Sequence, residues 1–421
     1  MSEVSSQSRE TGRQETTFRP VPLWRNRDYL LLIGGQAVSA IGSQISLVAF
    51  PLLIFALTGS AEQAGLMAAV RSLPVALFTL PAGVLVDRWD RRRLMLFCDA
   101  GRALVLGSIP VALIFGHLTS IQLYIVSFIE GTLFALFTLA EAAALPRVVA
   151  PEQLAQATSQ NTLLESLAGM IGPALGPILY GLGRAVPFLS DAVSYAVSVI
   201  SLLFIRTRFQ REREHEKRGG SVADLWRDVR EGIVWLWQKP LLRFLAIMTF
   251  GLNTPCYGYI LILIVLMQNM HASNTAMGVI LGASGVGSIV GSLIAGPLYK
   301  RLGFARLLIG SAWVWAVTWL LYAFAPTPLL LGVINAACFI VVPVYLVVQY
   351  TYRLSTIPDA LQGRVNSVFR LIAFSGPPLG MALTGYLLQL IGPFFTVIAL
   401  FIPQAVLCII ATLSRLVREA R

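Results

Sequence analysis

The sequence predicts an all-α integral membrane protein of twelve transmembrane helices in two pseudo-symmetric halves of six. Three observations predict this fold class: an apolar composition, a regular series of long apolar segments, and an internal repeat. Of the 421 residues, 56% are hydrophobic and only 13% are charged. Soluble domains average about 25% charged residues, so the composition indicates a membrane protein.

Twelve segments are apolar and long enough to cross a bilayer, whose core of about 30 Å takes about 20 residues of helix. They lie at roughly 29–57, 63–86, 94–115, 121–144, 161–183, 187–205, 241–268, 275–298, 304–324, 328–350, 367–389 and 394–415. The first six form an N-terminal half over 29–205, and the last six form a C-terminal half over 241–415. Polar segments make up the tails, 1–28 and 416–421, and the linker, 206–240.

The basic residues predict the orientation. With the N-terminus placed inside, nearly all of the 32 lysines and arginines fall in inner segments, and only Arg184 lies in an outer loop. Lysine and arginine are retained on the cytoplasmic side, so both termini are expected in the cytoplasm. Residues 1–28 lack the apolar stretch of a cleavable signal peptide, so the first span is itself an anchor. A multi-pass protein of the cell membrane is expected, in a bacterial inner membrane.

The linker contains a predicted amphipathic helix. After the charge run RTRFQREREHEKR, the stretch SVADLWRDVREGIVWLWQ places apolar residues at helical spacing. Ser221 and Asp224 resemble a capping box at its start. Such a helix is expected to lie at the inner membrane surface and to join the two halves.

The two halves repeat in sequence. A shift of 213 residues places Gly65 on Gly278 and Gly83 on Gly296, and a shift of 204 places GPALG at 172–176 on GPPLG at 376–380. Two six-span halves in the same orientation are typical of parallel-repeat transporters.

The stretch GVLVDRWDRRR at 83–93 resembles the loop signature of the major facilitator superfamily, G-x-L-x-D-R-x-G-R-K/R, between spans 2 and 3. The matching residues are Gly83, Leu85, Asp87, Arg88, Arg91 and Arg92, while Asp90 replaces the second glycine. The resemblance implies a gate whose charge pairs break and re-form as helices slide. It also implies that a loop arginine engages an acid at the inner end of span 4, where Glu141 stands. The alternative is a simple cytoplasmic retention signal.

A second stretch, SLAGMIGPALGP in span 5, is similar to the pattern G-x-x-x-G-P-x-x-G-G of family members that export by antiport. Gly172, Pro173 and Gly176 match, while Ala168 and Pro177 stand where glycines would be. The resemblance implies export; the alternative is a helix-packing kink. The segment LPRVVAPEQLAQATSQNTLLESLAGMIGPALG resembles the branch of enterobactin exporters and macrolide efflux pumps, which implies an amphipathic organic substrate.

Ionisable residues inside spans are functional candidates because burying a charge in the membrane is costly. Arg71 and Glu130 lie at matched depth in spans 2 and 4 and are expected to be partners. Glu130 is the candidate to take up and release a proton, and a static clamp is the alternative. Arg71, Asp99 and Arg102 are further proton-coupling candidates. Near the inner end of span 3, Arg102 is expected to face Asp99 or Glu141, and structural pairing is the alternative.

Other polar residues in the spans face either water or a central cavity in this prediction. Asp191, close to the outer end of span 6, is expected to be in contact with water rather than coupled. The candidates for lining a central cavity are Gln36, Gln44, Asn253, Tyr257 and Trp315.

Several classes of protein are excluded. No lysine follows glycine, so there is no phosphate loop of an ATP-driven pump, and the three histidines form no H-E-x-x-H site. The four cysteines have neither metal nor redox spacing. The basic residues lie in gaps between apolar runs rather than on one face, unlike those of a nucleic-acid-binding domain. We therefore expect neither an enzyme nor a bound metal or cofactor.

Together, the spans and the resemblance predict a monomeric secondary transporter with a small-molecule substrate. It would export an amphipathic organic molecule, such as a drug, macrolide or siderophore, in exchange for protons by alternating access. Two alternatives stay open. One is a proton-coupled importer of the same fold, and the other is a non-transporting membrane sensor that signals through the linker.

Overall fold

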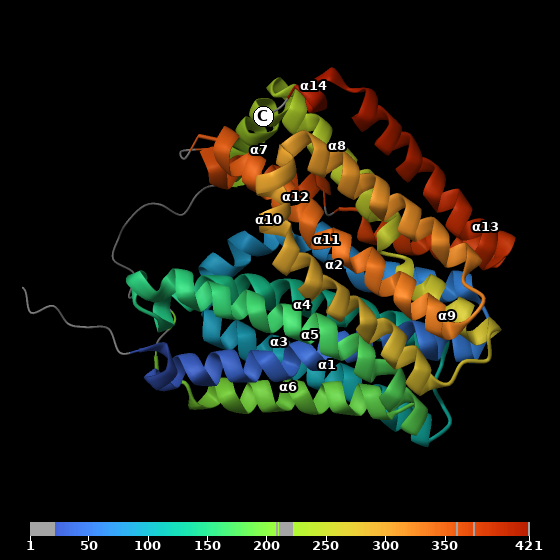
Figure 1. Ribbon diagram of the computed structural model, residues 1–421. Helices are drawn as coiled ribbons and strands as arrows, with labels where there is room; N and C mark the ends of the chain where they lie inside the picture. The colour runs from blue at the N-terminus through green and yellow to red at the C-terminus, as the bar shows by residue number, and fades with distance from the viewer. Residues whose placement is uncertain (1–21, 208, 210–221, 359–360, 374, 420–421) are drawn as a thin grey trace, which may run out of the picture.

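The computed structural model describes residues 22–207, 209, 222–358, 361–373 and 375–419. The side chains of residues 79–88, 222–226, 228 and 229 lie outside this description. Within the described residues every regular element is a helix, which confirms the all-α prediction (Figure 1).

The N-terminal group contains six long helices. They are α1 (Arg27–Thr58), α2 (Ala61–Arg88), α3 (Arg91–Ile114), α4 (Ser120–Val148), α5 (Leu154–Leu182) and α6 (Val186–Phe204). Side-chain caps explain where three of them begin, because an Asn, Asp or Thr oxygen accepts a backbone N–H that the helix leaves free. The caps are Asn26 for α1, Asp90 for α3 and Thr119 for α4.

The C-terminal group begins with a short surface helix. Its helices are α7 (Val222–Gln238), α8 (Pro240–Cys256), α9 (Tyr259–Asn269), α10 (Asn274–Leu321), α11 (Pro328–Thr356), α12 (Gln362–Ala373), α13 (Pro377–Leu413) and α14 (Arg415–Arg418). Two of them bend sharply at a glycine, α10 at Gly303 (φ 73°) and α13 at Gly392 (φ 74°). A positive φ is easily adopted only by glycine, so each helix consists of two straight segments.

Nine stretches of the described residues are long and apolar enough to cross a membrane. The sequence predicted twelve spans. Two of the three missing spans arise because each of two stretches, Asn274–Phe324 and Gln362–Leu413, runs across one of the glycine bends and is counted once. The third is α2, which is not among the nine stretches. Large apolar side chains on the outside of the molecule, such as Leu104 (76% exposed) and Leu329 (81% exposed), suit contact with lipid tails rather than water.

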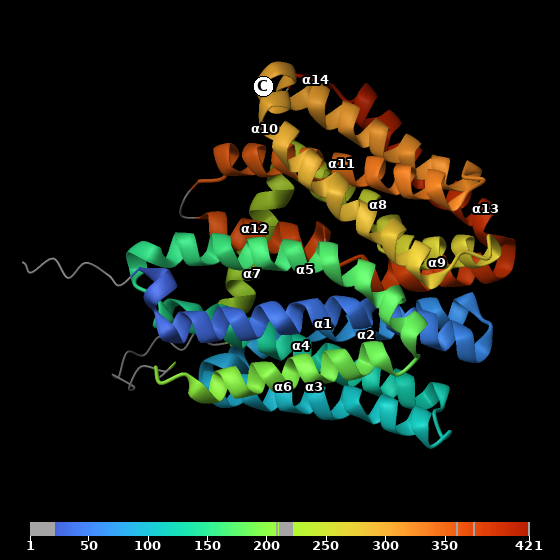
Figure 2. The same ribbon diagram turned by 60° about the horizontal axis from the view of Figure 1, so that its bottom comes forward.

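The helices form two bundles that lie side by side (Figures 1 and 2). Helix α1 packs on α5 and α6, α3 packs on α4 and α6, and α2 packs on α4. Helices α8 to α13 form the second bundle, with α10 packed extensively on α11. Helix α7 lies across α12 and α8, and its Glu231 pairs with Arg364 of α12 at 2.7 Å.

The bundles meet through α2 with α13 and through α5 with α10. These contacts lie toward the starts of α2 and α10 and the end of α5. A Cβ atom on Gly65 would come within 2.6 Å of the Gly385 Cα, and one on Gly278 would strike the Ala174 carbonyl oxygen. Close contact between the bundles therefore depends on glycine, and it lies at the helix ends opposite to the start of α1 and the end of α6 (Figure 1).

Candidate functional site

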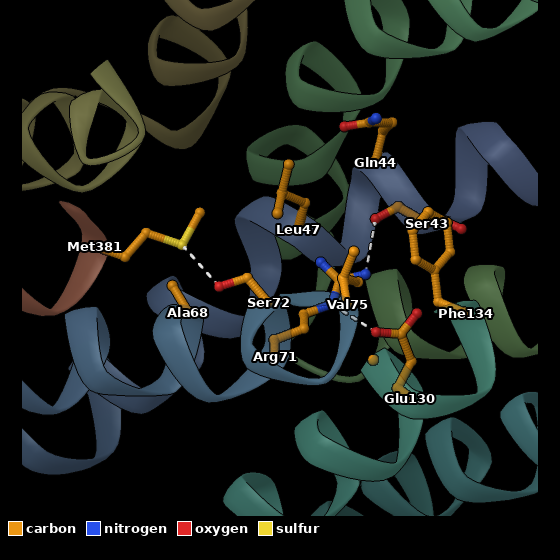
Figure 3. A pocket seen from close by; sticks show the side chains of 11 residues that line it. Ser43, Gln44, Leu47, Ala68, Arg71, Ser72, Val75, Glu130, Phe134 and Met381 are labelled. Carbon is orange, nitrogen blue, oxygen red and sulfur yellow. Dashed lines mark hydrogen bonds and ion pairs between the residues drawn. The ribbon is translucent and has the colours of Figure 1, made fainter. Parts of the chain in front are cut away.

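A pocket of about 190 Å³ lies where the two bundles meet (Figure 3). Ten of its lining residues come from α1, α2 and α4, and Met381 comes from α13. The lining residues are Ser43, Gln44, Leu47, Ala68, Arg71, Ser72, Val75, Glu130, Gly131, Phe134 and Met381. Drug-sized ligands occupy pockets of about 300–1,000 Å³, so the pocket in this conformation is too small for such a molecule.

Glu130 is held by two arginines at the wall of this pocket. The Arg71 Nε donates to Glu130 Oε2 at 2.6 Å, and the Arg102 Nη2 donates to Glu130 Oε1 at 2.9 Å. The Glu130 side chain is 1% exposed and that of Arg71 is 13% exposed. Figure 3 shows Arg71 and Glu130 turned toward one another beside the pocket. A buried carboxylate with a guanidinium on each oxygen ties α2, α3 and α4 together.

Arg102 is the centre of a wider buried network. Its Nη2 donates to the Ser43 hydroxyl of α1 at 3.2 Å, and its Nη1 lies 3.8 Å from Asp99 Oδ1. Its guanidinium carbon lies 3.9 Å from the ring centroid of Tyr195 in α6, a cation–π contact. Asp99 Oδ2 accepts from the Ser198 hydroxyl at 2.6 Å. Five helices of the N-terminal bundle thus share one network of charged and polar side chains.

Asp191 also belongs inside this bundle, and the expectation that it contacts water is wrong. Its side chain is fully buried. A Cβ atom on Gly42 would come within 2.5 Å of Asp191 Oδ1, so the backbone of α1 rests directly on the carboxyl group. The sequence position near the end of a span did not reveal this, because the facing glycine lies far away in the chain.

The structure brings the loop arginines of the predicted gate to the ends of other helices. The Arg91 Nη1 donates to the Ala143 carbonyl of α4 at 2.8 Å. Arg92 donates to the carbonyls of Leu202 and Leu203 at the end of α6, at 3.2 and 2.8 Å. The start of α3 is therefore fastened to α4 and α6.

The structure describes the other residues of that loop signature only in part. Helix α2 runs through Gly83, Asp87 and Arg88, but their side chains lie outside the description. Glu141, the expected acid, accepts a hydrogen bond from Asn161 of α5 at 3.1 Å. The Arg91 hydrogen bond to α4 described above is to a backbone carbonyl two residues beyond Glu141.

The span-5 residues Gly172, Pro173 and Gly176 are buried in α5. A Cβ atom on Gly172 would strike the Gln44 side chain, and one on Gly176 would lie 3.1 Å from the Ile45 carbonyl oxygen. Both glycines let α5 approach α1 closely, which is a packing role.

Of the five predicted cavity residues, Gln44 lines the pocket. Gln36 is buried in α1, and Asn253 donates to the Ala373 carbonyl at 3.4 Å. Tyr257 lies at the break between α8 and α9. The structure does not bring Trp315 to the pocket: it is 2% exposed and packs edge-on against Tyr345, with ring centroids 5.7 Å apart, in the core of the C-terminal bundle.

The sequence reasoning missed the polar faces that complete the network. Asp191, Tyr195 and Ser198 lie on one face of α6 at the spacing i, i+4 and i+7. On α1, Ser39, Ser43 and Ser46 recur in the same way. A search for polar residues at helical spacing inside apolar segments would have found both faces.

Long apolar helices in two bundles, with buried ion pairs at a pocket between them, define a membrane transport protein. The family model described as "Transmembrane secretion effector" matches residues 20–420. The chain belongs to this family, a branch of the efflux transporters of the major facilitator superfamily, and it is a multi-pass membrane transporter rather than an enzyme.

Named relatives agree with this assignment. The multidrug efflux pump Tap of Mycolicibacterium fortuitum is 27% identical over 93% of this chain and 96% of the relative. The enterobactin exporter EntS of Citrobacter koseri is 27% identical over 82% of each chain. Macrolide efflux protein A of Streptococcus pyogenes is 25% identical over 88% of this chain and 91% of the relative.

Solved structures show the same fold. The nucleoside transporter NupG superposes with a TM-score of 0.71 at 13% identity, over 94% of this chain and all of the other. A bacterial homologue of the lysosomal transporter Spinster, inward-facing and occupied, superposes with a TM-score of 0.72 at 15% identity, over 92% and 96% of the two chains.

Proposed function

We propose that this protein exports amphipathic organic molecules from the cell in exchange for protons, by alternating access. One observation carries the proposal: a carboxylate held by two arginines forms part of the wall of a pocket that both bundles line. The named exporters among its relatives act on drugs, a siderophore and macrolides. They support an organic substrate that is at least partly apolar, as the apolar residues of the pocket lining, Leu47, Val75, Phe134 and Met381, also do.

The proposed topology has twelve spans, in an N-terminal half at 29–205 and a C-terminal half at 241–415. Dividing α10 and α13 at their glycine bends and adding α2 brings the nine candidate stretches to twelve. The excess of lysine and arginine in the tails and in the 206–240 linker supports a cytoplasmic location for both termini, in the cell membrane. We propose that a single chain is the working unit, because both bundles that line the pocket belong to it.

With this orientation, the conformation described here is closed on the outer side. The α2–α13 and α5–α10 contacts then lie near the outer surface, where Gly65 meets Gly385 and Gly278 meets Ala174. Substrate would enter from the cytoplasm and would leave after these contacts open. The likeness to an inward-facing structure supports this assignment.

The coupling step in this proposal is the protonation of Glu130. The ionised carboxylate holds Arg71 and Arg102. A proton on Glu130 removes the charge that attracts both guanidinium groups, so Arg71, which lines the pocket, is released toward the substrate space. Loss of the proton restores the clamp. Protonated and deprotonated Glu130 would have to favour conformations open to opposite sides of the membrane for protons and substrate to be exchanged. A proton shifts the balance between these conformations only by the difference in its affinity for them.

Transport into inverted membrane vesicles tests the function. The vesicles come from cells that lack their own pumps, and the probes are ethidium, erythromycin and enterobactin, each with and without an acid interior. We expect at least one probe to accumulate, and a protonophore to abolish the accumulation. If no probe is concentrated, the proposal fails. If a probe is concentrated only when the gradient is reversed, the protein is an importer.

A further inference from the structure

The buried network in the N-terminal bundle contains one more acid than base. The guanidinium groups of Arg71 and Arg102 share it with the carboxyl groups of Glu130, Asp99 and Asp191. None of these side chains is more than 13% exposed. With all five ionised, the network would carry a net negative charge inside the membrane, which is unfavourable. One proton balances it.

The arginines already balance two of the three acids. Glu130 receives a guanidinium nitrogen on each oxygen, at 2.6 and 2.9 Å. Asp99 Oδ1 lies 3.8 Å from the Arg102 Nη1 without a hydrogen bond, and its Oδ2 accepts a hydrogen bond of 2.6 Å from the Ser198 hydroxyl. Each of these two carboxyl groups therefore has a guanidinium within 4.0 Å.

Asp191 differs from both. Among the residues that the structure describes, no lysine or arginine nitrogen lies within 4.0 Å of its carboxyl group. Its Oδ1 lies 3.3 Å from the Ser194 hydroxyl, and its Oδ2 has no hydrogen-bond partner. A fully buried carboxylate without a cation and with an unmatched oxygen is unfavourable, and a proton on that oxygen removes the charge.

Helix α1 covers this carboxyl group. The Gly42 backbone rests on Asp191 Oδ1, and the Ser46 hydroxyl faces the same carboxyl group. Movement of α1 along α6 would therefore expose Asp191. The charged and titratable groups that face it from the surrounding helices are Arg71 of α2, Arg102 of α3, Glu130 of α4 and Tyr195 of α6.

We propose that Asp191 is a second proton-binding site, distinct from Glu130, which is occupied in this conformation and empties when α1 moves off α6. The proton passes from the carboxyl Oδ2 to water that enters between the two helices. The carboxylate left behind is solvated by that water, because Arg71 and Arg102 already balance Glu130 and Asp99. The role of this site in coupling rests on the proposed function, whereas its occupancy does not.

Infrared spectroscopy of the purified full-length protein in lipid nanodiscs tests the occupancy. A protonated carboxyl group gives a C=O stretch that a carboxylate lacks. We expect the unmodified protein to show this band at neutral pH and Asp191→Asn to lose one component of it. Asp191→Glu, which keeps an acid, should shift that component rather than remove it.

Glu141→Gln is the matched comparison, because Glu141 is another acid within a helix and accepts a hydrogen bond from an uncharged side chain, Asn161. This variant should leave the Asp191 component in place. A band that is unchanged in Asp191→Asn overturns the proposal. If the Asn variant does not elute as a folded protein, a band unmoved in Asp191→Glu overturns it equally.

Ethidium accumulation in inverted vesicles tests the coupling role. Asp191→Asn should lose most of the stimulation by the proton gradient while downhill ethidium movement remains. Full stimulation in this variant would remove Asp191 from coupling. If the unmodified protein shows the Asp191 band but no response to the gradient, the proposed function fails and the occupied site stands.

Discussion

At the scale of single residues, Arg102 and Arg71 both hold Glu130 but lie in different surroundings. The Arg102 side chain is 3% exposed, pairs with Glu130 and Asp99, and donates a hydrogen bond to Ser43. The Arg71 side chain is 13% exposed, pairs with Glu130, and lines the pocket. Removing one partner of a buried ion pair leaves the other charge uncompensated, which destabilises the folded protein. The loss of stability is larger when more buried charges lose a partner.

We therefore expect Arg102→Leu to destabilise the protein strongly, by about 3–5 kcal/mol, and Arg71→Leu to destabilise it less while reducing transport. After Arg71→Leu, Glu130 still has Arg102. The melting temperature in detergent, read as the loss of the folded peak in size-exclusion chromatography after heating, measures the difference between the two variants. The exposed Arg306→Leu is the control and should melt like the unmodified protein. A larger loss for Arg71→Leu than for Arg102→Leu would contradict the described network.

The sequence predicts a residue of the site only where that residue stands out from its neighbours in the chain. Arg71 and Glu130 were paired from depth alone, because a charge within an apolar span is conspicuous, and the structure brings them together. Arg102 was expected beside Asp99 or Glu141, and its shorter ion pair is with Glu130. A rotation of one residue about a helix axis decides such a choice, and sequence does not fix that rotation.

At the scale of elements, the start of α3 is hydrogen-bonded to two other helices, α4 and α6. Arg91 bonds to the Ala143 carbonyl of α4, and Arg92 bonds to two carbonyls at the end of α6. Hydrogen bonds from charged groups contribute about 1.5–3 kcal/mol each, and less where water screens them. At the end of α6, Arg92 also satisfies the Leu203 carbonyl, which the helix leaves free.

In the proposed cycle of alternating access the Arg91 bond must break and re-form, and the loop signature predicts a gating role for Asp87. We therefore expect Arg91→Ala and Asp87→Asn to lower transport several-fold while the protein stays inserted. Ethidium uptake into inverted vesicles, normalised to the amount of protein in the membrane, measures the effect. Arg306→Ala, at an exposed position, is the control. Normal uptake by both variants at normal expression would favour the simple retention signal over a gate.

Predicting elements was easiest where the chain is long and apolar. Segments expected at 29–57 and 328–350 fall within α1 and α11. The glycines that bend α10 and α13, Gly303 and Gly392, lie between predicted spans, and at both positions the backbone angles are not helical. Interior close approaches, such as Gly42 on Asp191, were not predictable because they join distant parts of the chain.

At the scale of the whole molecule, the two bundles differ in chemistry. The shift of 213 residues that relates them places Arg71 on Ser284 and Arg102 on Trp315. The charged network therefore belongs to the N-terminal bundle, while the equivalent region of the C-terminal bundle contains aromatic and hydroxyl side chains. We infer that the N-terminal bundle binds protons and that the C-terminal bundle moves against it.

A cross-link across the α2–α13 contact tests whether the two bundles separate there during transport. The Ala61 backbone N–H donates to Gln389 Oε1 at 3.0 Å, across the α2–α13 contact. In a background without other cysteines, Ala61→Cys with Gln389→Cys should react with a short reducible bifunctional thiol reagent. Transport should then stop, and reduction should restore it. Each single cysteine variant is the control, and unchanged transport by the cross-linked protein would mean that this contact does not open.

The central claim is that Glu130 couples proton movement to substrate movement. The most direct measurement is proton flux in proteoliposomes that contain a pH-sensitive dye, when an ethidium gradient is imposed and no proton gradient is present. The unmodified protein and the exposed Glu152→Gln variant should drive protons against the ethidium flow. Glu130→Gln should bind ethidium without proton flux, and Glu130→Asp should keep part of the flux. No flux in the unmodified protein, or an undiminished flux in Glu130→Gln, would contradict the claim.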